Sequence, residues 1–226
     1  MFRLTLAACL LAVSLAAVAN PKTPNQIIDA VIERANAKIK ALGWDVMKNI
    51  QNGGTQFNLQ VSDSQSGSST AKKTFNITNA DMTGLGSLHR SKSGQFLNSN
   101  TVLKGSLRLT NARAKADYKL VFPGSGSAAP ASTSTGSVTE KADKLFVDFE
   151  FNLDANKVPQ SIKSWTVRSG RDGLEASSGL PTDGSGNIDV AGIRNSLLQV
   201  MKNTLNTNIK VQVNSAIQDW KTQASG

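Results

Sequence analysis

The chain has 226 residues, enough for one substantial hydrophobic core, and its 25 Lys and Arg against 16 Asp and Glu give a formal net charge of +9. A single cysteine excludes a disulfide framework, and an aromatic content of 5% with no interleaved Arg and Lys argues against a nucleic-acid partner. The basic residues are spread along the chain, which is typical of a soluble cationic surface.

Residues 1–19 have the pattern of a secretory signal peptide. Arg3 supplies the positive charge, an apolar run follows from Leu4 to Leu15, and Ala17-Val18-Ala19 is a small-residue cleavage site. The run is shorter than the ~20 residues of a membrane span, and it contains the only cysteine, Cys9. We therefore predict a secreted, extracellular protein whose mature chain, residues 20–226, is a single domain.

An amphipathic helix is predicted at the start of the mature chain. Asn25 is a candidate N-cap and Gly43 a candidate C-terminal stop. A further short turn is expected around Trp44 and Met47. The apolar residues of the helix recur at spacings of three and four: Ile27, Ile28, Val31, Ile32, Ala35, Ile39 and Leu42.

Alternating apolar residues predict the first strands. Phe57, Leu59 and Val61 alternate, as do Phe75 and Ile77 after a polar loop. Residues 79–94 have the pattern of a strand and a turn, with His89 in the turn. The tripeptide at 76–78 is a glycosylation sequon, which in an exported chain predicts a glycan on Asn76.

The longest alternating segment runs from Val102 to Phe122 and changes phase at Thr110–Asn111. A period of two predicts one half-buried antiparallel strand of about twice the usual ~5–6 residues, and the phase change predicts a bulge or bend. The apolar face carries Leu103, Leu107, Leu109, Ala112, Ala114, Ala116, Tyr118, Leu120 and Phe122. The opposite face is basic, with Lys104, Arg108, Arg113, Lys115 and Lys119.

Residues 123–137 contain only Gly, Ser, Ala, Pro and Thr, which predicts a flexible low-complexity loop. The next strand is clear because Leu145, Val147, Phe149, Phe151 and Leu153 alternate with polar residues, apart from Phe146 on the polar side. Trp165 and Val167 continue the sheet.

A long amphipathic helix is predicted from Asp189, its candidate cap, to Lys221, which is roughly 50 Å at about 1.5 Å per residue. Its β-branched residues are poor formers of an isolated helix, so packing must stabilise it. The predicted fold class is therefore α+β: a long curved antiparallel sheet wraps around this C-terminal helix, accompanied by the shorter N-terminal helix.

The residues that would support catalysis are few. One histidine and no mature cysteine leave neither a Cys–His pair nor a usual zinc site, and no G-x-S-x-G elbow is present. Asp148 and Glu150 alternate with apolar residues and belong to a solvent-facing row. We predict a protein that is not an enzyme and that has no metal and no cofactor.

A curved sheet around amphipathic helices can leave an apolar cleft, although each apolar residue alone is by default core. The candidate cleft residues are Phe57, Leu59, Phe75, Ile77, Leu107, Leu109, Tyr118, Leu120, Val147, Phe149, Phe151, Trp165, Ile193, Leu197 and Met201. The basic candidates, Arg108, Arg113, Lys115 and Lys119, either form solvated surface or contact an anionic glycolipid or membrane surface.

Four segments resemble the arthropod group 7 mite allergens, in the same order along nearly the whole mature chain: Asn76–Leu85, Val102–Phe122, Phe149–Leu153 and Ile162–Arg168. That family is similar to one half of the tubular lipid-binding proteins, which include bactericidal permeability-increasing and lipopolysaccharide-binding proteins. The resemblance implies a curved sheet around a long C-terminal helix, binding of lipids or other apolar ligands, and no catalytic residues. The juvenile-hormone-binding and takeout relatives usually carry an N-terminal cysteine pair, and its absence here argues against the hormone-carrier branch.

Three hypotheses follow. The first is a secreted binding protein that sequesters a lipid or another hydrophobic small molecule between sheet and helices. The second is an innate-immune protein that recognises bacterial glycolipid through its basic surface. The third is a structural secreted protein with a filled core and no ligand.

Overall fold

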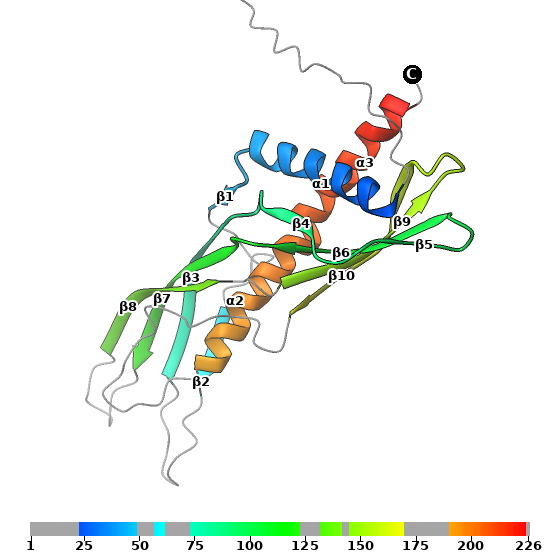
Figure 1. The fold of residues 1–226 in the computed structure, drawn as a ribbon. Helices are drawn as coiled ribbons and strands as arrows, with labels where there is room; N and C mark the ends of the chain where they lie inside the picture. Colours follow the sequence, from blue (N-terminus) through cyan, green and yellow to red (C-terminus); the bar gives the residue numbers. More distant parts are fainter. Residues whose placement is uncertain are drawn as a thin grey trace, which may run out of the picture.

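Two antiparallel sheets and one long helix make up the protein, as seen in a computed structural model that describes residues 23–48, 57–61, 73–122, 132–141, 145–169 and 190–224 (Figure 1). The first sheet has the order β1-β3-β7-β8, with β2 also paired to β3. The second sheet has the order β10-β9-β6-β4, with β5 also paired to β6. The predicted α+β class, with antiparallel strands and a helix at each end, is confirmed, although the strands form two sheets and not one.

The strands of the first sheet are β1 (Val46–Met47), β2 (Phe57–Val61), β3 (Lys73–Thr83), β7 (Arg113–Phe122) and β8 (Ser132–Lys141). The strands of the second sheet are β4 (Leu88–Arg90), β5 (Gln95–Leu97), β6 (Val102–Leu109), β9 (Leu145–Leu153) and β10 (Pro159–Ser169). The helical segments are α1 (Pro24–Ala41), α2 (Val190–Thr204), a π-helical turn (Leu205–Ile209) and α3 (Lys210–Ala224).

The segment predicted as one long strand is two strands in different sheets. β6 ends at Leu109 in the second sheet, and β7 begins at Arg113 in the first. Leu109 and Ala112 are both buried although they are three residues apart, so the chain has to leave the strand period between them. A Cβ on Gly84, which has φ +77°, would lie 2.2 Å from the Asn111 carbonyl oxygen, so only glycine permits this close crossing.

The N-cap of α1 is Thr23, not the predicted Asn25. Thr23 accepts a hydrogen bond from the Gln26 backbone N–H, and the Gln26 side chain accepts one from the Thr23 N–H, which is a capping box. Pro24 occupies the first helical position. Asn25 instead accepts a 2.8 Å hydrogen bond from the Gly94 N–H. The predicted helix stop at Gly43 is confirmed, since α1 ends at Ala41 with Gly43 at φ +68°.

The short turn predicted around Trp44 and Met47 is wrong for Met47, which lies in a strand. Val46 and Met47 form β1, which pairs with the end of β3. The predicted loop at residues 123–137 is also wrong over 132–137, because these residues belong to β8. A ten-residue register joins β8 to β7, from Lys141 opposite Arg113 to Ser132 opposite Phe122, so pairing overrides a composition typical of loops.

The long C-terminal helix is present, but it is not a uniform α-helix. A π-helical turn at Leu205–Ile209 joins α2 to α3, and the predicted cap Asp189 lies outside the described residues. The buried row recurs every four residues: Leu197, Met201, Leu205, Ile209, Val213 and Ile217. In an α-helix of ~3.6 residues per turn such a row drifts around the surface, and one wider turn brings it back toward the sheets.

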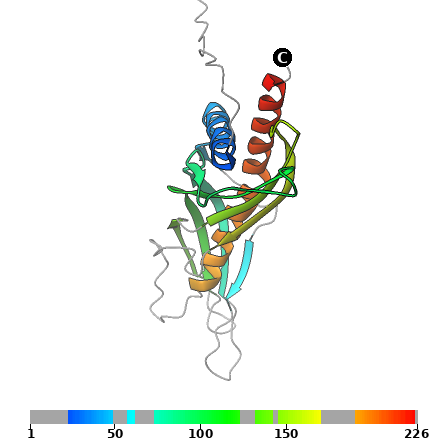
Figure 2. The ribbon, with the colours of Figure 1, turned by 45° about the vertical axis from the view of Figure 1, so that its right-hand side comes forward.

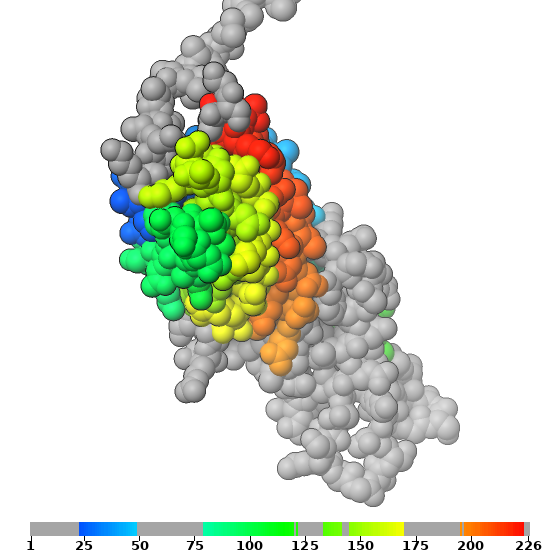
Figure 3. Space-filling model, turned by 90° about the vertical axis from the view of Figure 1, so that its right-hand side faces the viewer, coloured from blue at the N-terminus to red at the C-terminus, as the bar shows by residue number. Residues whose placement is uncertain are grey.

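The main hydrophobic core lies between the second sheet, α1 and α3, and extends to Met82 and Ala114 of the first sheet and to Met201 of α2. Figure 2 shows α1 beside α3, and Figure 3 shows the yellow-green and yellow strands β9 and β10 lying along the orange and red helix. Lys38 of α1 and Asp219 of α3 form an ion pair of 2.6 Å, and the Arg34 guanidinium lies 4.8 Å from the centre of the Trp220 ring. α1 therefore closes the second-sheet end of the long helix.

Candidate functional site

The inner face of the second sheet is filled by large side chains. Val147, Phe149 and Phe151 alternate inward on β9 and are buried, with exposed fractions of only 1–2%. The rings of Phe149 and Phe151 stack with centroids 4.2 Å apart. The candidate cleft residues in this main core are Leu107, Leu109, Val147, Phe149, Phe151 and Met201. This end of the protein is a packed core.

Six of the other candidate cleft residues come together on the first sheet, whereas Trp165 lies on β10 of the second sheet, and Ile193 and Leu197 lie on α2. In the backbone register Phe57 lies opposite Ile77, Leu59 opposite Phe75, Phe75 opposite Leu120, and Ile77 opposite Tyr118. The side chains of Phe57, Leu59, Phe75, Ile77, Leu120 and Ile193 lie outside the described residues. Tyr118 is described and is 6% exposed. Positions far apart in sequence thus form two cross-strand rows on β2, β3 and β7.

At the β1 end of the first sheet the inner face carries Met82, Ala114 and Glu140, of which Met82 and Ala114 belong to the main core. Beyond them the described inner face carries small side chains outside the main core: Ala80, Ala116, Gly136 and Val138. Leu197 and Val200 of α2 are buried without belonging to the main core, and α2 contacts β2 and β7. The seam between α2 and the first sheet is therefore apolar, and its described strand residues are smaller than those of the second sheet.

Tyr118 and Met82 are the large buried apolar side chains described on this inner face, and of the two only Tyr118 lies outside the main core. Its ring lies over Gly136 on the neighbouring strand, where a Cβ would come within 2.4 Å of the tyrosine oxygen and 2.7 Å of Cζ. Burial raises the pKa of the Tyr118 hydroxyl, because the tyrosinate would lose its hydration. Tyr118 thus places a neutral phenol in the seam.

Polar links join α3 to its neighbours. Besides the Lys38–Asp219 ion pair, Arg34 donates a 3.2 Å hydrogen bond to the Gln223 side chain. Gln218 of α3 donates one of 3.3 Å to the carbonyl of Gln160, at the start of β10. These links fix the α3 half of the helix to α1 and to the second sheet.

Two buried polar groups were missed by the sequence analysis. Glu140 on β8 is 0% exposed and lies opposite Ala114, and it escaped notice because the preceding residues were interpreted as a loop. Trp165 is half-buried against the main core, and its indole N–H is buried without a hydrogen-bond partner in the described structure. Nothing in the local sequence around Trp165 indicates this.

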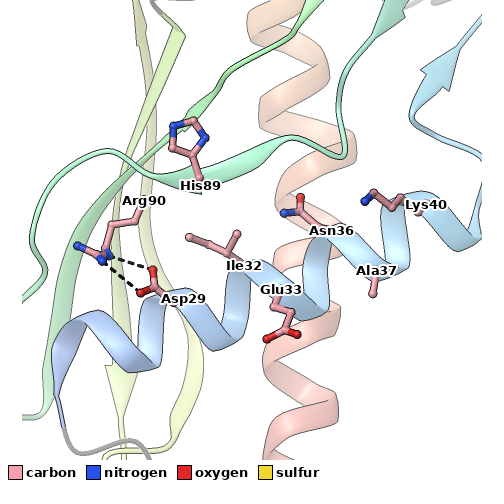
Figure 4. A pocket seen from close by; sticks show the side chains of 8 residues that line it. All are labelled: Asp29, Ile32, Glu33, Asn36, Ala37, Lys40, His89 and Arg90. Atoms are coloured by element: carbon pink, nitrogen blue, oxygen red, sulfur yellow. Dashed lines mark hydrogen bonds and ion pairs between the residues drawn. The ribbon is translucent and has the colours of Figure 1, made fainter. Parts of the chain in front are cut away.

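A shallow groove of about 480 Å³ lies between α1 and β4 (Figure 4). Its lining residues are Asp29, Ile32, Glu33, Asn36, Ala37, Lys40, His89 and Arg90. Arg90 forms a 2.9 Å ion pair with Asp29, and the hydrogen bond to that carboxylate raises the pKa of Arg90. Asn36 donates to the Leu88 carbonyl at 2.8 Å and accepts from the Leu88 N–H at 3.2 Å. These bonds between residues at the groove hold α1 against β4, the edge strand of the second sheet.

His89 lies on strand β4, not in the predicted turn. Its Nε2 accepts a hydrogen bond from Arg108 Nε, and its Nδ1 lies 3.2 Å from the Ser87 carbonyl oxygen. Both contacts are met by the neutral ring with its proton on Nδ1. His89 therefore positions Arg108. Among the described residues no group of three His, Cys, Asp or Glu side chains is arranged to hold a metal ion.

The four basic candidates do not form one stripe. Arg108 is on β6 of the second sheet, whereas Arg113, Lys115 and Lys119 are on β7 of the first. Asp81 lies directly opposite Lys115, and Asp117 stands between Lys115 and Lys119 on the same exposed row. The predicted glycan position, Asn76, lies on β3, with its side chain outside the described residues.

No family model matches the sequence, and no curated protein matches it. Among solved structures, Takeout 1 of Epiphyas postvittana is similar, with 18% identity over 74% of this chain and 73% of that one and a TM-score of 0.31. A lipopolysaccharide binding protein is similar with 11% identity over 85% of this chain, 38% of that one, and a TM-score of 0.42. The chain thus spans about two fifths of that protein's length. At these scores neither likeness carries an argument about function.

Proposed function

We propose that the protein is a secreted, single-domain, non-catalytic carrier that holds a lipid or another hydrophobic small molecule between α2 and the first sheet. One observation carries this proposal: the α3 half of the long helix is fixed over a filled core, while the α2 half lies on an apolar seam whose described strand residues are small. We assign it to the tubular lipid-binding proteins, in the branch of the group 7 mite allergens.

The seam has the chemistry for an apolar ligand. Leu197 and Val200 lie on its helix side, and Ala116 and Val138 lie on its sheet side. Each Å² of apolar surface removed from water contributes about 25 cal/mol, so a lipid tail can bind without a specific polar anchor. Such a site selects for hydrophobicity and length more than for a particular head group.

The polar links on α3 favour the α2 side of the helix as the place for the ligand. The ion pair and hydrogen bonds of Gln218, Asp219 and Gln223 fix α3 to α1 and to β10, so a ligand beneath α3 would have to break them. The π-helical turn lies between the two halves, and such turns are frequent at functional sites. We therefore place the ligand on the α2 side of this turn.

This placement divides the candidate cleft residues by role. Those of the main core, such as Phe149 and Phe151, serve stability. Those in register on the first sheet, together with Tyr118 and Leu197, contact the ligand.

The hypothesis of glycolipid recognition through the basic surface is less favoured, because Arg108 and Lys115 lie on different sheets and the acidic Asp81 lies opposite Lys115. A ligand-free protein remains the alternative that the experiment must test.

The direct test is native mass spectrometry of the protein purified from a eukaryotic secretion host, followed by organic extraction. We expect a fatty acid, phospholipid or sterol at reproducible stoichiometry. A bare polypeptide mass, together with no uptake of a fluorescent fatty acid, would overturn the proposal in favour of a filled core.

The location of the ligand can be tested with two matched substitutions of buried alanines. Ala116→Leu adds volume to the seam, and Ala35→Leu adds the same volume to the main core. Overpacking costs about 1–3 kcal/mol at either site, but only Ala116→Leu should lower the ligand content. Equal ligand contents in the two folded variants would contradict the placement.

The chain also carries a separate spectroscopic probe at each end. Its only tyrosine, Tyr118, lies in the first sheet, while its three tryptophans belong to the main core or pack against it. Ligand in the seam should exclude more water from Tyr118 and raise the pKa of its hydroxyl further, as read from tyrosinate absorbance. An unchanged titration on removing the ligand, with a shift in tryptophan emission, would place the ligand elsewhere.

A further inference from the structure

The tip formed by Leu42–Lys48, between α1 and the end of β1, leaves two large aliphatic side chains in water. Leu42 is 52% exposed and Val46 is 48% exposed. Figure 1 shows β1 beyond the C-terminal end of α1, on the side away from β9 and β10. Leu42 and Val46 contribute little to the core, so their place at this tip calls for another explanation.

The turn that ends α1 determines which side chains face outward. The Trp44 N–H donates to the Ile39 carbonyl at 2.9 Å and the Gly43 N–H donates to the Lys40 carbonyl at 2.9 Å, which is a Schellman motif. Trp44 packs against the main core, to which Ile39 belongs. Leu42, at the C-cap between them, is left on the outside.

β1 presents Val46 outward on the first sheet. Met47 pairs with the fully buried Met82, so its neighbour Val46 belongs to the opposite, outer face. In the register Val46 lies opposite Thr83, and Thr83 lies opposite the exposed Arg113. An exposed aliphatic and an exposed guanidinium therefore share one row of the outer face.

The charges around the tip are basic. Lys40 and Lys48 flank it and are exposed. The one acidic residue between them, Asp45, is turned back onto the protein, where its side chain accepts a 3.1 Å hydrogen bond from the Gly86 N–H and its carbonyl accepts a 2.9 Å bond from the Gly84 N–H. These bonds also hold the tip rigidly against the turn after β3.

We propose that this tip docks the protein on an anionic lipid bilayer, with Leu42 and Val46 inserted among the lipids and Lys40, Lys48 and Arg113 at the head groups. Exposed aliphatics flanked by Lys and Arg are the composition that binds such surfaces. A protein partner fits less well, because two side chains offer far less than the about 800 Å² per partner of a standard protein interface. The docking goes beyond the carrier function and does not depend on the ligand site.

The test is co-sedimentation with vesicles of phosphatidylcholine alone and of phosphatidylcholine with about 30% phosphatidylserine, at low and high salt. The wild type should bind the anionic vesicles, with binding that weakens as salt rises. The double variant Leu42→Ser with Val46→Ser should lose about tenfold in partitioning, because it keeps the charges and loses the insertion.

Val211→Ser is the matched control, since Val211 is the third large aliphatic that is strongly exposed in the described structure, at 58%, and lies on α3 away from the tip. It should bind as the wild type does. A second double variant, Lys40→Gln with Lys48→Gln, should lose about fivefold per lysine on anionic vesicles only. Because all these side chains are exposed, every variant should keep the wild-type unfolding temperature and its extracted ligand.

Three results would each overturn the docking proposal. They are wild-type binding that is equal on neutral and anionic vesicles, no wild-type binding to either vesicle, and a Leu42→Ser, Val46→Ser variant that sediments like the wild type. None of them bears on the ligand in the seam, which is measured by extraction.

Discussion

The two halves of the long helix rest on sheets of the same antiparallel type but with different inner faces. Around α3 the second sheet presents large side chains such as Phe149 and Phe151, and α1 closes the other side. Around α2 the inner face of the first sheet that lies outside the main core carries Ala80, Ala116, Gly136 and Val138 among the described residues, with Tyr118 as the large exception. The same architecture thus supports a core at one end and, in our proposal, a ligand compartment at the other.

A pair of glycines illustrates the difference. In each sheet an aromatic ring lies over a glycine at the register position opposite it, Phe149 over Gly105 and Tyr118 over Gly136. Phe149 is enclosed by Phe151 and by α1, whereas Tyr118 lies beside the edge strand β8. We therefore expect the contact between ring and glycine to adjust more readily in the first sheet than in the second.

The largest effect is expected from Phe149→Ala. Removing a fully buried ring from a close-packed core lowers the free energy of unfolding by about 3–5 kcal/mol, because the cavity cannot collapse completely. Urea unfolding at neutral pH measures this loss. If the second sheet is the stabilising end, the ligand extracted from the remaining folded protein should be unchanged.

Phe146→Ala is the control on the same strand. Phe146 faces outward, half-buried, with the Arg168 guanidinium 4.6 Å from its ring centre, so we expect a loss of about 1 kcal/mol or less. Equal losses for Phe146→Ala and Phe149→Ala would mean that the second sheet does not have the packed inner face described here.

A smaller effect is expected from adding one methyl group to each glycine. At Gly105 a Cβ would lie 2.4 Å from Phe149 Cζ and 2.8 Å from Ile28 Cδ1, and neither group has room to move. Gly105→Ala should therefore lower the free energy of unfolding by about 1–3 kcal/mol in thermal or urea unfolding.

Gly136→Ala should be milder, at about 1 kcal/mol or less, because β8 is an edge strand and the Tyr118 ring can shift toward the seam. Since the shift would change the hydration of Tyr118, its tyrosinate titration should move as well. If Gly136→Ala proves as damaging as Gly105→Ala, the first sheet is packed as rigidly as the second, and the proposed compartment loses its physical basis.

Much of the fold could be predicted because periodicity reports directly on burial. The alternation of β9 and the three-and-four spacing of α1 each identify an element whose inner face is continuous. The capping box at Thr23 can also be predicted from the sequence, since Thr is followed three residues later by Gln, whereas residue type alone points to Asn25.

What could not be predicted depends on partners distant in sequence. A change of phase at Thr110–Asn111 is equally compatible with a bulge and with a change of sheet, and only the close approach of Gly84 decides between them. β8 has a loop-like composition and exists through its pairing with β7. The candidate cleft was spread over both sheets because apolar alternation is identical in a filled core and in a binding site.

The smallest effect is expected from Asp148→Asn on the outer face of the second sheet. Burial alone would raise the pKa of Asp148, but hydrogen bonds from Arg168 and Ser106 and the charges of Arg168 and Lys92 outweigh it, so the pKa is lowered. The stabilisation from a lowered pKa is present above the unfolded value of about 3.9 and is lost as the pH falls through the folded value. Because the Asp148 and Arg168 side chains are 40% and 38% exposed, we expect no more than about 0.5 kcal/mol.

Urea unfolding of the wild type and Asp148→Asn at pH values from neutral down to about 3 measures this contribution. The two proteins should differ slightly at neutral pH and converge in acid, where the wild-type carboxylate is protonated. The ligand content should stay the same, because Asp148 lies on the outer face of the second sheet and takes no part in the seam at α2. A difference that persists unchanged in acid would mean that shape or packing at Asp148, and not its ion pair with Arg168, determines the effect.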